Sequence, residues 1–361
     1  MRSITEIKTG LGTAIGGRDE RRHLAALFSD MCRSVELGDP LSEGASRGYH
    51  PHAYFASRRA WPTITRNSLM HPRTQQALLA MPVILTIGAA IAWAGSQASI
   101  GVAGWPLFAL CGAFSFIVNW LIFIPAFAFQ TERYFDLSGS LTYLALMVAA
   151  LLLGLADERA WLLAGLIGLW AARLGSFLFV RVIADGGDGR MDALKPNFVR
   201  FLMTWTLQGL WVFLTASCAL AAMTTATAVP LGGFAYLGAT LWIIGFACEV
   251  VADHQKRVFR RDPTNNGRFI TSGLWAWSQH PNYFGEILLW FGIALIALPT
   301  LRGAQYATLI SPIFVFVLLT RISGIPLLRG RARKRWGEDA GYLAYRARTA
   351  TLFPRPPKAQ S

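Results

Sequence analysis

Charged residues and cysteines are both scarce in this chain of 361 residues. Only 15% of the residues carry a charge, whereas 53% are hydrophobic. Soluble globular domains contain about 25% charged residues, so this composition excludes an ordinary soluble domain. The four cysteines show no CxxC pair or other metal-ligand spacing. Three of them fall in apolar segments, where cysteine is a small packing residue, so the sequence gives no sign of a metal site.

We expect no secretory signal peptide in the N-terminal region. Residues 1–76 are polar, contain Gly and Arg, and show no basic segment followed directly by an apolar run. We expect this region to be disordered, or to lie upstream of a natural translation start near Met70. We therefore divide the chain into a polar extension over 1–76, a transmembrane helical domain over 77–328 and a basic tail over 329–361.

Long apolar blocks are what the chain has in abundance. A helix needs about 20 mostly apolar residues to cross the hydrocarbon layer of a bilayer. Eight blocks of roughly that length can be placed, at residues 78–93, 102–129, 137–155, 160–183, 198–223, 232–251, 282–298 and 304–328. The sequence therefore predicts an all-α integral membrane protein, a bundle of about seven or eight transmembrane helices.

The distribution of Lys and Arg orients these helices. Basic residues concentrate between the sixth and seventh blocks and in the tail, whereas the connections after the first and fifth blocks carry no charge. Alternating the eight spans puts every basic segment and both termini on one side, which the positive-inside rule makes the cytoplasm. Topology and anionic membrane lipids then account for the net charge of +14, and no nucleic-acid partner is needed.

The most informative motif is GLWAWSQHPNYFGE, at residues 273–286. His280, Asn282, Tyr283 and Glu286 stand together at the start of an apolar run, and Pro281 suits the first turn of a helix. Asn282 and Glu286 then share one helix face. Because ionisable groups are costly in lipid, this cluster predicts a functional site. The alternative is that these residues form a helix cap and an interfacial aromatic belt.

A second polar stretch precedes this motif. Glu249, Asp253, Lys256 and Arg260 recur every three to four residues, so they share one face if the sixth helix extends beyond the membrane. Arg268 follows a turn rich in Pro and Asn. Guanidinium groups bind phosphates in bidentate fashion, and carboxylates and amides suit ribose hydroxyls and a carboxamide. The alternative is an ordinary solvated basic loop.

Polar residues also interrupt the interior of the predicted bundle. Arg173 and Arg181 lie eight residues apart in the fourth span, and Gln208 lies in the fifth. We expect Arg173 and Gln208 to face the bundle interior, because lipid does not tolerate them. The charged residues gather toward the cytoplasmic half, as a cavity that opens to the cytosol would require.

Taken together, these motifs resemble the steroid 5-alpha-reductase-like membrane reductases, and most closely a bacterial branch of unknown function of the DUF1295 type. The resemblance covers about residues 80–356. It rests on the pattern Glu249, Asp253, Lys256, on GLW…SxHPNYFGE, and on a basic C-terminal segment with Tyr342 and Tyr345. Segments 132–143 (ERYFDLSGSLTY), 187–190 (GDGR) and 208–211 (QGLW) look like the same branch.

The resemblance implies an NADPH-dependent oxidoreductase of CH–CH groups, whose cofactor enters a membrane cavity from the cytoplasm, in a bacterial inner membrane. The basic tail contributes to that cofactor site. Gln279 departs from the arginine usual in this branch, and Glu249 replaces an asparagine. The residues implied in cofactor binding are Glu249, Asp253, Lys256, Arg260, Arg268, His280, Asn282, Tyr283, Glu286, Tyr345 and Arg348.

The expected chemistry is hydride transfer to a polarised C=C bond of a lipid-like substrate, with an acid that supports the opposite end. The candidate acids are Tyr134 and Tyr143, with Asp136 to orient one of them; the alternative is that both tyrosines belong to the interfacial aromatic belt. A second enzyme hypothesis is an isoprenylcysteine carboxyl methyltransferase-like protein that uses S-adenosylmethionine. A third is a lipid-binding or transport protein without chemistry.

Overall fold

A computed structural model describes residues 71–185 and 191–356 of the chain. The first 70 residues, the 187–190 motif and the side chain of Arg181 lie outside the described part. The first helix begins at Pro72, so it takes in residues that we had assigned to the polar extension. Proline is favoured at this position, where its missing N–H leaves no donor unpaired.

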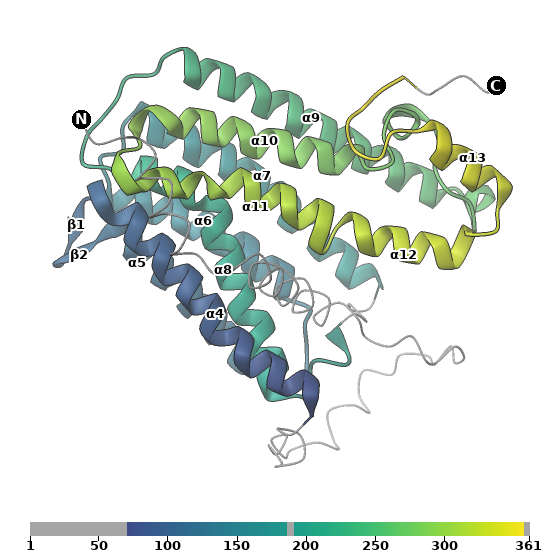
Figure 1. Ribbon diagram of the computed structural model, residues 1–361, viewed down its shortest axis with the longest axis horizontal. Helices are drawn as coiled ribbons and strands as arrows, with labels where there is room; N and C mark the ends of the chain where they lie inside the picture. Colours follow the sequence, from purple (N-terminus) through teal and green to yellow (C-terminus); the bar gives the residue numbers. More distant parts are fainter. Residues whose placement is uncertain (1–70, 186–190, 357–361) are drawn as a thin grey trace, which may run out of the picture.

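The described ranges contain eight helical segments long and apolar enough to cross a membrane, which confirms the predicted all-α membrane bundle. Figure 1 shows the long helices packed side by side with almost no β-structure. The long helices are α4 (Pro72–Gly95), α5 (Leu107–Ala128), α6 (Phe135–Leu153), α7 (Glu158–Asp185), α8 (Phe198–Met223), α9 (Gly233–Arg261) and α10 (Pro281–Ala297).

The eighth span is built from shorter pieces. A 3-10 segment, Gly303–Leu309, leads into α11 (Ile310–Val317), and a π-helical turn, Leu318–Ile322, leads on to α12 (Ile325–Trp336). Helix α13 (Ala340–Arg348) follows, and the small strands β1 (Gly101–Val102) and β2 (Trp105–Pro106) form a hairpin between α4 and α5. The elements after Leu309 thus carry the chain from the membrane to a basic terminal segment.

Helix α8 is the centre of the bundle. Its most apolar window is 94% buried, whereas that of α4 is 22% buried. Helices α4, α5, α6, α10 and α11 all pack against α8. Apolar side chains on the outer helices stay exposed, as with Leu79 at 69% and Leu152 at 76%, which is the surface that a helix presents to lipid.

Helices α9 and α10 run side by side at unusually close range (Figure 1). A Cβ on Gly285 would lie 2.4 Å from the carbonyl oxygen of Gly245, and a Cβ on Gly292 would lie 2.4 Å from that of Gly238. Small residues at such positions allow the backbones of membrane helices to approach closely. The start of α10 is thereby held against the part of α9 that carries Glu249.

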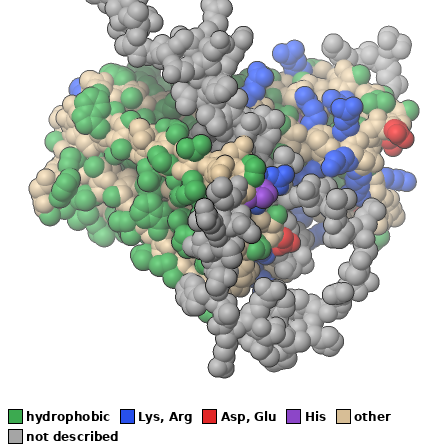
Figure 2. Space-filling view, turned by 60° about the horizontal axis from the view of Figure 1, so that its bottom comes forward, with side chains coloured by type: hydrophobic (Ala, Val, Ile, Leu, Met, Phe, Trp, Pro, Cys, Tyr) green, Lys and Arg blue, Asp and Glu red, His purple; other side chains and the backbone are tan. Residues whose placement is uncertain are grey.

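The two ends of the bundle differ in charge. Lys and Arg side chains gather at the right-hand end in Figure 2, the end that holds α12 and α13, and hydrophobic side chains cover much of the rest. Helix α9 continues to Arg261, beyond the apolar block that we placed at 232–251, so the sixth helix extends into this basic end as expected. Helix α10 starts at Pro281, also as expected.

Candidate active site

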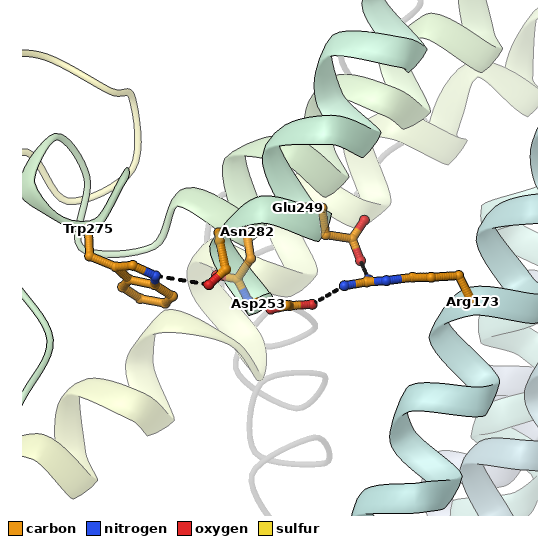
Figure 3. Close-up of polar contacts among 6 residues, drawn as sticks. Arg173, Glu249, Asp253, Trp275 and Asn282 are labelled. Atoms are coloured by element: carbon orange, nitrogen blue, oxygen red, sulfur yellow. Dashed lines mark hydrogen bonds and ion pairs between the residues drawn. The ribbon is translucent and has the colours of Figure 1, made fainter. Parts of the chain in front are cut away.

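Arg173 of α7 forms ion pairs with two acids of α9. Its Nη1 atom bonds to Glu249 Oε1, and its Nη2 atom lies 2.5 Å from Asp253 Oδ2. Figure 3 shows the arginine reaching across from its own helix to both carboxylates. The side chains are 18% (Arg173), 4% (Glu249) and 14% (Asp253) exposed. These charges are therefore largely removed from water, where ion pairs are screened least.

Helix α10 supplies the third side of this site. The amide of Asn282 donates to Asp253 Oδ1 at 3.2 Å. Glu286, one turn further along α10, lies within electrostatic range of Asp253 and Arg173. We call Arg173, Glu249, Asp253, Asn282 and Glu286 the three-helix polar network. It brings three carboxyl groups together around one guanidinium.

One acceptor in the network has no donor. Glu249 is 3% exposed, and its Oε2 atom has no hydrogen-bond partner within the described residues. A buried acceptor left without a donor costs free energy. A ligand that brings a hydroxyl or an amide N–H to this atom would remove that cost.

A tryptophan links the outer part of α9 to the C-terminal helix. Trp275 donates its indole N–H to the carbonyl of Ala252 at 3.0 Å, and its own carbonyl accepts from the Tyr345 hydroxyl at 2.7 Å. The ammonium of Lys256 lies 4.5 Å from the Trp275 ring centroid, a cation–π contact. The indole of Trp275 also points toward α9 in Figure 3. Lys256 and Tyr345 thus both contact Trp275, the first at its ring and the second at its backbone carbonyl.

The residues just before α10 are clamped to the tail. The Gln279 side-chain amide donates to the carbonyls of Thr349 at 2.7 Å and Arg346 at 3.3 Å, and its backbone N–H donates to that of Ala350 at 2.8 Å. The Ser278 hydroxyl donates to the carbonyl of Leu352 at 2.8 Å. The side chain of Gln279 thus faces the tail, where it satisfies carbonyls at the end of α13.

His280 is held as a neutral ring. It is 8% exposed and stacks on Tyr283, with ring centroids 5.6 Å apart and an interplanar angle of 12°. Burial, and to a lesser extent the nearby charges of Lys256 and Arg329, lower the pKa of His280 to about 3. A neutral imidazole adds no positive charge for a phosphate. His280 and Tyr283 therefore shape the entrance of α10 by stacking.

The two candidate acids lie in different surroundings. Tyr134 is 54% exposed and stacks on Phe179 at 6.2 Å. Tyr143 is 8% exposed and packs between Trp170 and Trp290, at 5.3 and 6.2 Å between ring centroids. Tyr143 also lies within electrostatic range of Glu286. Only Tyr143 is therefore brought to the three-helix polar network; Asp136 lies in the first turn of α6, next to Tyr134 in sequence.

The remaining predicted cations lie further out. Arg260 is exposed near the end of α9, Arg268 lies within electrostatic range of Asp262, and Arg348 of Tyr345. The positive charges thus lie beyond the two acids, on the C-terminal part of α9 and then on α13. This order places carboxyl and amide groups toward the bundle interior and cations toward the basic end.

Two residues of this site were not predicted as site residues from the sequence. Arg173 was expected to face the bundle interior, but its partners could not be named. The spacing of Glu249 and Asp253 by one helical turn was the available indication, because two acids on one face call for a cation. Trp275 was part of the motif but had no assigned role.

Comparison with known proteins supports a single family. The family model described as a protein of unknown function, DUF1295, matches residues 122–349. An uncharacterized protein, C594.04c, of Schizosaccharomyces pombe is 25% identical over 46% of this chain and 56% of its own length. The 3-oxo-5-alpha-steroid 4-dehydrogenase 1 of Bos taurus is 33% identical over 23% of this chain and 31% of its own length.

A third relative has a different printed activity. The probable O-methyltransferase ustE of Ustilaginoidea virens is 28% identical over 32% of this chain and 41% of its own length. The chain thus spans between about a third and just over half of the length of these curated relatives, and no solved structure matches it significantly. The likeness to the steroid 5-alpha-reductases is nevertheless confirmed at family level, and the chain belongs to the DUF1295 family.

Proposed function

We propose that this membrane protein is an NADPH-dependent reductase of a polarised C=C bond in a lipid-like substrate, of steroid, isoprenoid or fatty type. The observation that carries the proposal is the Oε2 atom of Glu249, which is buried without a partner among the described residues and lies in the same network as Asp253 and Asn282. The steroid dehydrogenase relatives support the same reaction class. The matched regions span less than a third of the length of these relatives.

The chain's side chains fit such a cofactor. Glu249 Oε2 accepts a hydrogen bond from a carboxamide or a ribose hydroxyl, and Asn282 provides an amide with both donor and acceptor atoms. Further out, Lys256, Arg260 and Arg348 supply the positive charge that pyrophosphate and a 2′-phosphate require. Because Gln279 is bonded to the tail, the 2′-phosphate would be held by these cations.

When bound, NADPH supplies a hydride, and the protein must provide a proton for the other carbon of the double bond. We assign the hydrogen-bond donor to Tyr143, whose hydroxyl would support the carbonyl oxygen that polarises the bond. Its neighbours Trp170 and Trp290 are 4% and 0% exposed, so the phenol is shielded from water and suited to an apolar substrate. Glu286 lies within electrostatic range of Tyr143.

An O-methyltransferase is the second candidate. It is favoured by the ustE relative and by the excess of carboxylates in the three-helix polar network, because the sulfonium of S-adenosylmethionine is a cation. That methyl donor carries no phosphate, however, and would leave the cations from Lys256 outward without a role. A lipid-binding or transport protein without catalytic activity is the third candidate, because such a protein requires only membrane helices whose outer surfaces face lipid.

We also propose that the protein lies in a bacterial inner membrane with its C-terminal segment in the cytoplasm. The basic end that contains α12 and α13 (Figure 2) would then face the cytosolic pool of NADPH, in agreement with the positive-inside rule. A protease-accessibility assay on oriented vesicles would test this orientation.

Ligand-induced thermal stabilisation distinguishes the three functions. The purified protein is heated with NADPH, NADH or S-adenosylmethionine, and a ligand at a hundred times its Kd adds about 2.7 kcal/mol of stability. We expect NADPH to stabilise most. Stabilisation by S-adenosylmethionine alone would assign the methyltransferase, and none by any of the three would leave the lipid-binding function.

Variants then locate the site. Asn282→Ala and Glu286→Ala should remove the NADPH-induced shift, because both side chains belong to the network. Tyr143→Phe should keep the shift and lose turnover, since only the hydroxyl is removed. Tyr134→Phe is the matched control, exposed and outside the network, and should keep both. Loss of turnover in Tyr134→Phe but not in Tyr143→Phe would refute the assigned donor.

A further inference from the structure

Arg200 is a buried cation that meets no counter-ion among the described residues. It lies in the first turn of α8 and is 9% exposed. Its Nη1 atom donates to the carbonyl of Ala193 at 3.2 Å, and its Nη2 atom is buried with no partner within the described residues. Removing a guanidinium from water without pairing it is expensive. The side chain therefore has unused capacity to bind an anion.

A second arginine adds to the positive charge. Arg73, in the first turn of α4, is exposed and lies within electrostatic range of Arg200. Two like charges held this close repel each other, and the repulsion is strongest where one of them is buried. Of the acids in the neighbouring segments that the structure describes, Glu132 and Asp192 are bonded to Lys195, at 2.6 and 2.7 Å. An external anion would neutralise the arginine pair.

The first turns of α4 and α8 are fastened together beside these arginines. The Asn197 side chain accepts a hydrogen bond from the Arg200 N–H at 3.0 Å and donates to the Thr74 hydroxyl at 3.0 Å. Figure 1 shows the two helix starts next to each other at the lower edge of the bundle. The N–H groups of Arg73, Thr74 and Gln75 in α4 already bond to His71, and Asn197 caps α8. What the two helix starts contribute is therefore their positive dipole ends, which reinforce the charge of Arg73 and Arg200.

We propose that Arg73, Arg200 and the first turns of α4 and α8 form a binding site for a phosphate group. The alternating spans put both helix starts on the same membrane face as the basic C-terminal helices. The neighbouring side chains Leu78 and Leu79 are 42% and 69% exposed, so acyl chains could lie along α4 beneath the phosphate. The phosphate belongs either to a phospholipid headgroup or to inorganic phosphate, and the site is separate from the proposed cofactor site.

The test begins in a maltoside detergent, whose headgroup contains no phosphate. Unfolding is followed by the fluorescence of the 13 tryptophans while phosphatidylglycerol, or inorganic phosphate at constant ionic strength, is titrated in. We expect the Tm of the wild type to rise with at least one of them. A rise with phosphatidylglycerol alone identifies a lipid headgroup, and an equal rise with inorganic phosphate identifies a soluble anion.

Two variants and a control make the test specific. Arg200→Met should start at an equal or higher Tm, because the unpaired buried charge is gone, and should show no rise. Arg73→Gln should fold normally and need a higher concentration for half the rise. Arg302→Gln, which removes an exposed arginine from the connection between α10 and α11, should behave as the wild type. A wild type that responds to neither ligand, or an Arg73→Gln titration identical to that of the wild type, would overturn the site.

Discussion

Arg173 and Asp253 are joined across α7 and α9 by a 2.5 Å ion pair. The same guanidinium also bonds to Glu249, one turn earlier on α9, so a single side chain fixes two buried acids. Because the acids then face the start of α10, where Asn282 meets Asp253, the position of α7 decides the shape of the proposed cofactor site.

Replacing Arg173 by Met should therefore disable the site. The variant leaves Glu249 and Asp253 without their cation, and breaking a buried ion pair costs about 3–5 kcal/mol. We expect a loss near 3 kcal/mol, because Arg173 keeps some contact with water. A thermal melt should show the lower Tm, and the NADPH-induced stabilisation should disappear.

Arg159→Met is the matched control for this prediction. Arg159 is also buried, at 1% exposed, and donates to the carbonyl of Pro230 at 2.7 Å and to that of Ile296. It lies at the far end of α7 from Arg173, so its loss should lower the Tm and leave the Kd for NADPH unchanged. Equal loss of NADPH affinity in both variants would mean that Arg173 acts through general stability alone.

The close approach of α9 and α10 gives a second prediction. Gly285→Ala adds a Cβ that would lie 2.4 Å from the Gly245 carbonyl oxygen and 2.7 Å from the Glu249 nitrogen. The helices must move apart, at a cost of about 1–3 kcal/mol, and Asn282 would move away from Asp253. We expect a lower Tm together with weaker NADPH binding in a titration.

Gly165→Ala supplies the comparison, since a Cβ there meets nothing within 4 Å. Alanine also favours a helix by about 1 kcal/mol over glycine, so this variant should equal or exceed the wild type in Tm. If Gly285→Ala matched it, the glycine contact would not set the spacing of the two helices.

His280 should make stability depend on pH. Its pKa is about 3 in the folded protein, against an ordinary value of 6.5, because burial disfavours the charged ring. Below about pH 6.5 the unfolded chain takes up a proton that the folded chain does not, so the free energy of unfolding should fall from there toward pH 3, by up to about 1.4 kcal/mol per pH unit. Melts between pH 7 and pH 4.5 measure the slope.

His280→Phe, which keeps a ring beside Tyr283, should flatten that slope. The exposed His254 offers the control, and His254→Phe should retain the slope of the wild type. An unchanged slope in His280→Phe would show that other groups govern the acid response.

The clamp between the tail and the motif gives a fourth prediction. Gln279→Ala loses the bonds to the carbonyls of Thr349 and Arg346, each worth about 1 kcal/mol. The tail should detach more often, so limited proteolysis should remove it faster than in the wild type. Gln97→Ala, an exposed glutamine that donates to the carbonyl of Trp93, should be cleaved at the rate of the wild type.

Local patterns in the chain were enough for the elements of this fold. Pro281 marked the start of α10, and the polar stripe from Glu249 to Arg260 indicated that α9 extends beyond its apolar part; both agree with the structure. The two candidate acids were indistinguishable by sequence, since Tyr134 and Tyr143 flank the same segment. Their different burial depends on the helices packed around α6, which no local pattern encodes.

The apolar runs alone determined that the chain is a bundle of membrane helices, because in lipid every backbone polar group must be satisfied within its own segment. The partners of the polar residues were decided only by the tertiary structure. Arg173 and Glu249 are 76 residues apart in sequence and meet because small residues and interhelical packing set the spacing of the helices. The same packing turns the Gln279 amide toward the tail and buries Arg200 away from every acid in the part of the chain that the structure describes.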